Sequence, residues 1–172
     1  RPMLASSASD VAAALRGTRV DDQTPLAVDC KLDGIRVQVH KVGGDVQVYT
    51  RTLEEITARV PEVVEAVAAL DAHALVLDGE AIALDASGRA RPFQETAART
   101  ASRTDADVLR AEVPLTPYFF DLLHLDGTDL LDLPARARFD QMVAVLPAEL
   151  VVPRVVTDDP VEVETFFADT VA

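Results

Sequence analysis

Two runs of alternating apolar and polar residues, joined by a tight turn, constrain the fold of this chain most strongly. Residues 35–40 alternate strictly, so their apolar side chains share one face of an extended strand. The sequence Gly-Gly-Asp at 43–45 is a turn signal, and residues 46–51 alternate again. The pattern predicts an antiparallel hairpin, and it differs from the β-α-β alternation that is typical of a parallel sheet.

The rest of the chain predicts more extended segments and several amphipathic helices. A second turn signal, Asp78-Gly79, is expected to interrupt one of the strands. The resulting fold class is α+β, with antiparallel sheets flanked by helices. Further strands are expected at 26–31, 74–84, 115–125 and 150–156, and helices at 10–16, 61–70, 92–99, 134–146 and 159–172.

Composition narrows the functional classes. The 172 residues are 49% hydrophobic, which suffices for one core, and no apolar run is long enough to span a membrane. The single Cys30 allows no internal disulfide, which predicts a cytoplasmic protein with Cys30 as a small buried residue. A net charge of −13 argues against strong nucleic-acid binding by this chain alone. The chain begins with Arg1, which suggests a piece of a longer protein.

One lysine lies between two carboxylates in the segment 29–36, which reads DCKLDGIR. If residues 29–33 are extended, Asp29, Lys31 and Asp33 project from the same face. Asp33-Gly34 is a hairpin-turn signal between two apolar runs. The segment therefore predicts an amine held in a small acidic cluster near a tight turn.

Two interpretations of Lys31 stay open at this point. One is a solvated ion pair on a strand edge, which contributes about 0–1 kcal/mol. The other is a covalent nucleophile, which must lose its proton before it attacks a phosphoryl centre. Carboxylates alone oppose that loss, whereas a divalent cation with an anionic phosphate favours it. Burial, a neighbouring arginine or a bound cation could each favour the loss of the proton, and a metal ion together with a phosphate ligand fits best.

Three downstream segments stand out for their residue types. Arg51 ends the second hairpin strand, where a solvated arginine is expected without further context. Glu80 follows Asp78-Gly79 and is either a surface residue of a turn or a carboxylate that can accept ribose hydroxyls or help to hold a metal ion. Core packing is the default for Phe119 and Phe120, which point to opposite faces, so at most one of them lies wholly in a given core layer. The three histidines lack metal-ligand spacing.

These segments, in this order, resemble the motifs of covalent nucleotidyltransferases, and in particular of ATP-dependent DNA ligases of the bacterial and archaeal type. The family usually has Glu at the position of Asp29. Phe93 and Arg99, in the segment that begins at Pro92, resemble a further ligase segment of undefined role. The resemblance implies the DNA ligase and capping-enzyme nucleotidyltransferase fold, which is ATP-grasp-like, incomplete at the C-terminus. Residues 1–172 would form part of an adenylation domain, with the DNA-binding and OB-fold domains outside this chain.

The resemblance also implies a reaction. Lys31 would take AMP from ATP, pass it to the 5′-phosphate of nicked duplex DNA, and allow the nick to be sealed, with Mg²⁺ as cofactor. Such enzymes serve DNA repair, replication and recombination, and a monomer without membrane contact is expected. The other implied ATP or AMP contacts are Asp29 to the adenine amine, Cys30 through its backbone, Asp33, Arg36 to ribose or phosphate, Arg51 to phosphate, Glu80 to ribose and Phe120 to the base; the metal ligands are unassigned.

Other functions stay open on the sequence. An RNA ligase or a GTP-using capping enzyme shares the lysine motif, and a non-catalytic acidic interaction domain would carry it by chance. An NAD-dependent ligase is disfavoured because the cysteines of its zinc module are not in this sequence. The 172 residues alone are expected to react with ATP weakly or not at all.

Overall fold

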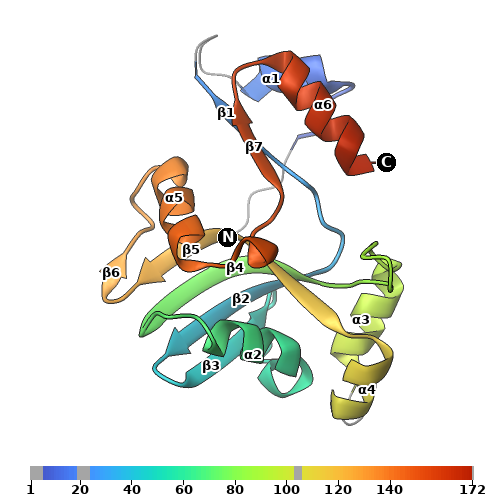
Figure 1. Cartoon of the computed structure of the whole chain (residues 1–172), viewed down its shortest axis with the longest axis vertical. Helices are drawn as coiled ribbons and strands as arrows, with labels where there is room; N and C mark the ends of the chain where they lie inside the picture. The colour runs from blue at the N-terminus through green and yellow to red at the C-terminus, as the bar shows by residue number, and fades with distance from the viewer. Residues whose placement is uncertain (1–5, 19–23, 103–105, 172) are drawn as a thin grey trace. The chain divides into compact units, whose positions relative to one another are not determined.

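The computed structural model describes residues 6–18, 24–102 and 106–171, and the chain divides into two compact units (Figure 1). Residues 1–31 and 153–172 belong to the first unit, and residues 32–152 form the second. None of the helices in the described part of the chain has the length and apolar character needed to cross a membrane.

The second unit is built on a five-stranded antiparallel sheet with the strand order β3-β2-β4-β5-β6. The hairpin predicted from the alternation is confirmed, with Val42 paired to Asp45 at its turn. The expected interruption at Asp78-Gly79 is wrong, because β4 continues through both residues. The strands are β2 (Ile35–Val42), β3 (Asp45–Thr50), β4 (Ala74–Ala83), β5 (Leu115–Leu125) and β6 (Thr128–Asp129).

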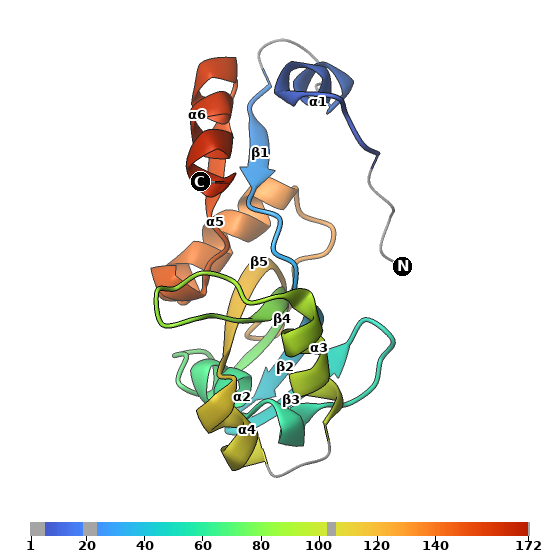
Figure 2. The ribbon, with the colours of Figure 1, turned by 90° about the vertical axis from the view of Figure 1, so that its right-hand side faces the viewer.

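One face of this sheet forms the core of the second unit. Its strands contribute every second residue, and the side chains of Val37, Leu77 and Phe119 are fully buried. Helix α2 (Pro61–Ala68), which Pro61 begins, packs against this sheet (Figure 2). It adds Val63 and Val67 to the same core. The remaining helical segments of this unit are η1 (Thr57–Arg59), α3 (Phe93–Ala101), α4 (Ala106–Glu112), α5 (Ala135–Val145) and η2 (Ala148–Leu150).

A buried ion pair fastens helix α3 to this core. The Arg99 side chain is 1% exposed, and its Nη2 lies 3.2 Å from Oε1 of Glu62 in α2. The same Glu62 oxygen accepts the backbone N–H of Leu115, the first residue of β5. Arg99 also donates to the carbonyl of Arg59. The segment around Phe93 and Arg99 thus has a structural role, which the sequence left undefined.

The predicted hairpin turn at Asp33-Gly34 is wrong. The strand before it, β1 (Leu26–Asp29), pairs with β7 (Arg154–Thr157), whereas β2 belongs to the other sheet. Gly34 is required for a different reason: a Cβ there would lie 2.3 Å from Cγ2 of Ile82 and 2.4 Å from the carbonyl oxygen of Ala81. The glycine allows the chain to pass close to β4.

The first unit combines the two-stranded β1–β7 sheet with two helices that contact each other, α1 (Val11–Thr18) and α6 (Pro160–Val171). Leu15 and Val163 are buried in it. Asp10 caps α1 by accepting the N–H of Ala13 at 2.7 Å, as its sequence position predicts. The strand expected at 150–156 is present but starts later, because η2 occupies 148–150 and β7 begins after Pro153.

Candidate active site

The predicted site residues are divided between the two units. Asp29, Cys30 and Lys31 lie at the end of the first unit's β1 segment, and the others lie in the second unit. β1 ends at Asp29, two residues before the expected end of the strand at Lys31, so strand alternation does not assign Asp29, Lys31 and Asp33 to one face. The second unit holds Asp33, Arg36, Arg51, Glu80 and Phe120.

The segment that leads to Lys31 is tied to β7 within the first unit. Nε and Nη2 of Arg154 donate to the two carboxylate oxygens of Asp29 at 2.5 and 2.7 Å. The backbone N–H of Cys30 donates to the carbonyl of Pro153 at 3.0 Å. Cys30 is half-buried, not fully buried as expected, and this burial raises the pKa of its thiol. These contacts fix the backbone immediately before Lys31, whose own side chain is exposed.

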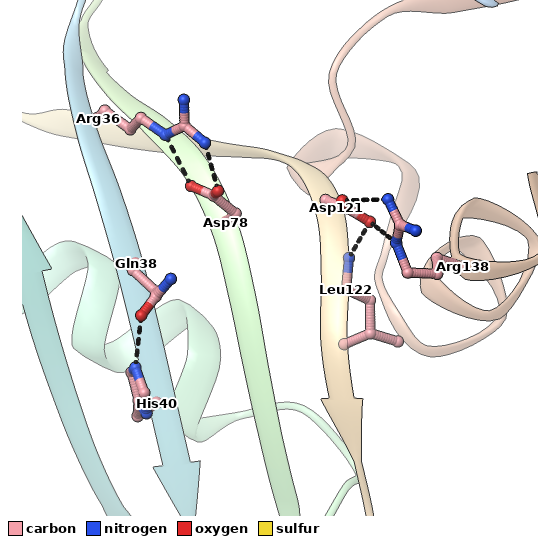
Figure 3. Close-up of polar contacts among 7 residues, drawn as sticks. All are labelled: Arg36, Gln38, His40, Asp78, Asp121, Leu122 and Arg138. Carbon is pink, nitrogen blue, oxygen red and sulfur yellow. Dashed lines mark hydrogen bonds and ion pairs between the residues drawn. The ribbon is translucent and has the colours of Figure 1, made fainter. Parts of the chain in front are cut away.

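Arg36 is the centre of a polar cluster on the face of the five-stranded sheet opposite the core. Its Nε and Nη2 donate to the two oxygens of Asp78, the Nη2 contact being 2.5 Å (Figure 3). These bonds raise the pKa of the Arg36 guanidinium. The guanidinium carbon lies 5.3 Å from the centroid of the Phe120 ring, within the range of a cation–π contact. The structure therefore brings together Arg36 and Phe120, two of the predicted site residues.

Glu80 belongs to the same face. Its Cα pairs with that of Arg36 across β2 and β4, and its Oε1 accepts the backbone N–H of Gly34 at 3.1 Å. This bond links Glu80 to the segment that precedes β2. The neighbouring Gly79 faces the core side, where a Cβ would lie 2.6 Å from Cδ1 of Phe119. The second Asp-Gly signal thus marks close packing within a continuous strand.

Arg51 lies apart from this cluster in the described contacts. It is exposed in the turn after β3, where the N–H of Leu53 donates to the carbonyl of Thr50 at 2.9 Å. Leu53 closes the turn with a φ of 65°, a left-handed conformation that glycine adopts more readily. The structure therefore places Arg51 at a loop tip.

Sequence reasoning did not assign a role to three charged residues that hold the candidate site. Asp78 could have been found from the alternation that puts it on the face of Glu80. Arg138 on α5 pairs with Asp121 on β5, and no local signal predicts a contact between a helix and a strand that far apart in sequence. Arg154 likewise meets Asp29 only through the β1–β7 pairing.

The carboxylates around Arg36 do not fit a magnesium site by themselves. Both carboxylate oxygens of Asp78 accept hydrogen bonds from Arg36, and both oxygens of Asp121 accept hydrogen bonds from Arg138. In residues 6–18, 24–102 and 106–171, no three His, Cys, Asp or Glu side chains gather in a metal-binding arrangement. Two of the histidines bond to other side chains: His40 to Gln38 and His124 to Asp129.

Relatives of known family match this chain along nearly all its length. A probable DNA ligase of Beutenbergia cavernae is 59% identical over 171 residues, which cover 99% of this chain and 33% of that protein. A probable DNA ligase of a Nocardioides species is also 59% identical, over 167 residues that cover 97% of this chain and 31% of that protein. The chain spans about a third of the length of these relatives.

Solved structures agree with the sequence matches. A mycobacterial DNA ligase D complexed with ATP and MES superimposes with a TM-score of 0.60 at 26% identity, covering 86% of this chain and 44% of that one. The ligase domain of LigD from M. tuberculosis gives a TM-score of 0.59. The family described as "ATP dependent DNA ligase domain" matches residues 2–172. The chain therefore belongs to the family of ATP-dependent DNA ligase domains, and the predicted resemblance and α+β fold are confirmed.

Proposed function

We propose that this chain is the core of the adenylation domain of an ATP-dependent DNA ligase, which takes up AMP on Lys31 and, within the complete protein, seals nicks in duplex DNA. The family match over residues 2–172 carries the proposal. The 59% identity to probable DNA ligases supports it. The DNA-binding and OB-fold domains would lie outside the 172 residues.

In the first step, neutral Nζ of Lys31 attacks the α-phosphorus of ATP. A P–N bond forms, and the bond to the leaving pyrophosphate breaks. The ammonium proton of Lys31 must leave first, because a protonated amine has no electron pair to donate. In the next steps, the DNA 5′-phosphate takes AMP from Lys31, and a 3′-hydroxyl then displaces AMP as the phosphodiester forms.

The polar face of the sheet supports a role in binding the nucleotide. Phe120 offers an aromatic ring for the adenine, and Glu80 offers carboxylate oxygens for the ribose hydroxyls. Arg36, which already pairs with Asp78, adds a positive charge for ribose or phosphate. Because these three residues share one face of one sheet, a single nucleotide can reach all of them.

The remaining predicted contacts are assigned by their position near Lys31 or at a loop tip. Asp29 would accept a hydrogen bond from the adenine amine, and the backbone of Cys30 would contact the nucleotide. Both residues lie in the segment that is anchored to β7. Asp33 would lie near the nucleotide, and exposed Arg51 would contact a phosphate. Mg²⁺ would accompany the ATP phosphates, and we assign it no ligands in this chain.

Nicked duplex DNA is the proposed partner of the complete protein, which we expect to act as a cytoplasmic monomer. The net charge of −13 means that most of the positive DNA-binding surface must come from elsewhere in that protein. We also expect these residues alone to react with ATP weakly and to seal nicks poorly.

Labelling with α-³²P nucleotides tests the proposal. The complete protein should be labelled by ATP and not by GTP, and nicked DNA with a 5′-phosphate should remove the label as the nick is sealed. A nick without the 5′-phosphate is the control and should leave the label in place. Labelling by GTP alone would contradict the proposal and indicate a capping enzyme. Transfer of the label to nicked RNA and not to DNA would contradict it and indicate an RNA ligase. No labelling at all would favour a non-catalytic domain.

A further inference from the structure

The strand that carries Phe120 has an irregular register with its neighbour. Phe119 pairs with Gly79, but the next β4 residue along the pairing, Asp78, is opposite Asp121. Phe120 is therefore an extra residue in β5, which makes this position a β-bulge. Bulges leave one residue outside the regular ladder and re-aim its side chain, often beside active sites.

Arg138 fixes the residue that follows the bulge. Its Nε and Nη2 each lie 2.8 Å from one oxygen of Asp121 (Figure 3). Its Nη1 donates to the carbonyl of Leu133 at 2.7 Å. Asp121 Oδ1 also accepts the N–H of Leu122 at 3.0 Å. The two side chains are only 18% and 24% exposed. A bidentate arginine in this setting holds Asp121 in one orientation.

A second bidentate pair flanks the bulge on the other strand. Asp78, the Cα partner of Asp121, is held by Arg36, and the Arg36 guanidinium lies over the Phe120 ring. Phe120 is thus followed directly by the anchored Asp121, and its ring is contacted by Arg36. Because strand side chains alternate, a slip of one residue in this register would turn Phe120 toward the core face.

We propose that Arg138, acting through Asp121, is a positioning residue that holds the bulge at Phe120 and so aims the ring that binds adenine. This inference rests on the proposed function, since it assigns Phe120 to the base. Arg138 itself does not contact the nucleotide. Arg138 affects the binding of ATP only by orienting the Phe120 ring.

The test measures the rate of AMP-lysine formation against ATP concentration in the complete protein. Arg138→Ala should raise KM for ATP about tenfold while kcat changes less than about twofold. Phe120→Ala should raise KM similarly. In the Phe120→Ala background, Arg138→Ala should add nothing, because both substitutions remove the same contact. A purely structural role for Arg138 would give additive effects, or would reduce the active fraction without a change in KM.

Two further variants make the result decisive. Asp121→Asn keeps the size of the side chain but removes the charge that Arg138 holds, and it should reproduce the rise in KM even if Arg138→Ala does not fold. Arg110→Ala is the matched control, because it breaks another bidentate pair, with Glu65 at 2.6 Å through both oxygens, between α4 and α2. Its KM should equal that of the wild type.

The inference is overturned if Asp121→Asn keeps the wild-type KM, or if the Arg138 and Phe120 effects add. These outcomes leave the labelling of the wild type intact. Failure of the wild type to form AMP-lysine from ATP would instead overturn the proposed function, so the two results are distinguishable.

Discussion

The two faces of the five-stranded sheet have the same strands but different chemistry. On one face, the side chains of Val37, Leu77 and Phe119 are fully buried among apolar neighbours. On the other face, Arg36 and Asp78 form a half-buried ion pair. The alternation of side chains along each strand produces both faces at once. Substitutions of neighbouring residues on one strand should therefore change stability and nucleotide binding separately.

Phe119 and Phe120 provide the largest expected contrast. Phe119→Ala removes a fully buried ring and should lower the free energy of unfolding by about 3–5 kcal/mol. Phe120→Ala removes a half-buried ring and should instead raise KM for ATP, with a smaller loss of stability. Urea unfolding of both variants of the complete protein, beside their AMP-lysine kinetics, measures the contrast. Equal losses of stability would show that the two faces are not separable.

Gly79 tests how tightly the core face is packed. A Cβ at this position would lie 2.5 Å from the carbonyl oxygen of Tyr118 and 2.6 Å from Phe119. Gly79→Ala should therefore cost about 1–3 kcal/mol of unfolding free energy, measured by urea denaturation. Gly44→Ala is the control, since nothing lies within 4 Å of its Cβ position, and it should be close to neutral. A neutral Gly79→Ala would contradict the close packing of β4 on β5.

Substitution of His40 should give the smallest effect, a change in how the stability of the protein depends on pH, and it tests burial on the polar face. Burial lowers the pKa of His40, which packs edge-to-face on Tyr49. The unfolded chain, with an ordinary histidine pKa near 6.5, then binds the proton first, so stability is lost as the pH falls below about 6.5. His40→Gln should reduce the difference in urea midpoint between pH 7 and pH 5. An unchanged difference in His40→Gln would contradict the burial effect.

The parts of the fold that depend on local pattern could be predicted from the sequence. Alternation predicted the β2–β3 hairpin and the opposite faces of Phe119 and Phe120. The Asp33-Gly34 turn was predicted wrongly because Gly34 is required by its close tertiary contact with β4, and such a contact has no local sequence signature. The partners of Asp29 and Asp121 were missed for the same reason: Arg154 is 125 residues from Asp29 in sequence.

The position of the AMP adduct tests the central claim most directly. The chain has only two lysines, and Nζ of the buried Lys41 donates to the carbonyls of Ala68 and Leu70 at the end of α2. Peptide mapping of the labelled complete protein should find AMP on Lys31. Lys31→Arg should abolish labelling, whereas Lys41→Met should lower stability and keep the label. Adduct on another residue, or full labelling of Lys31→Arg, would contradict the account.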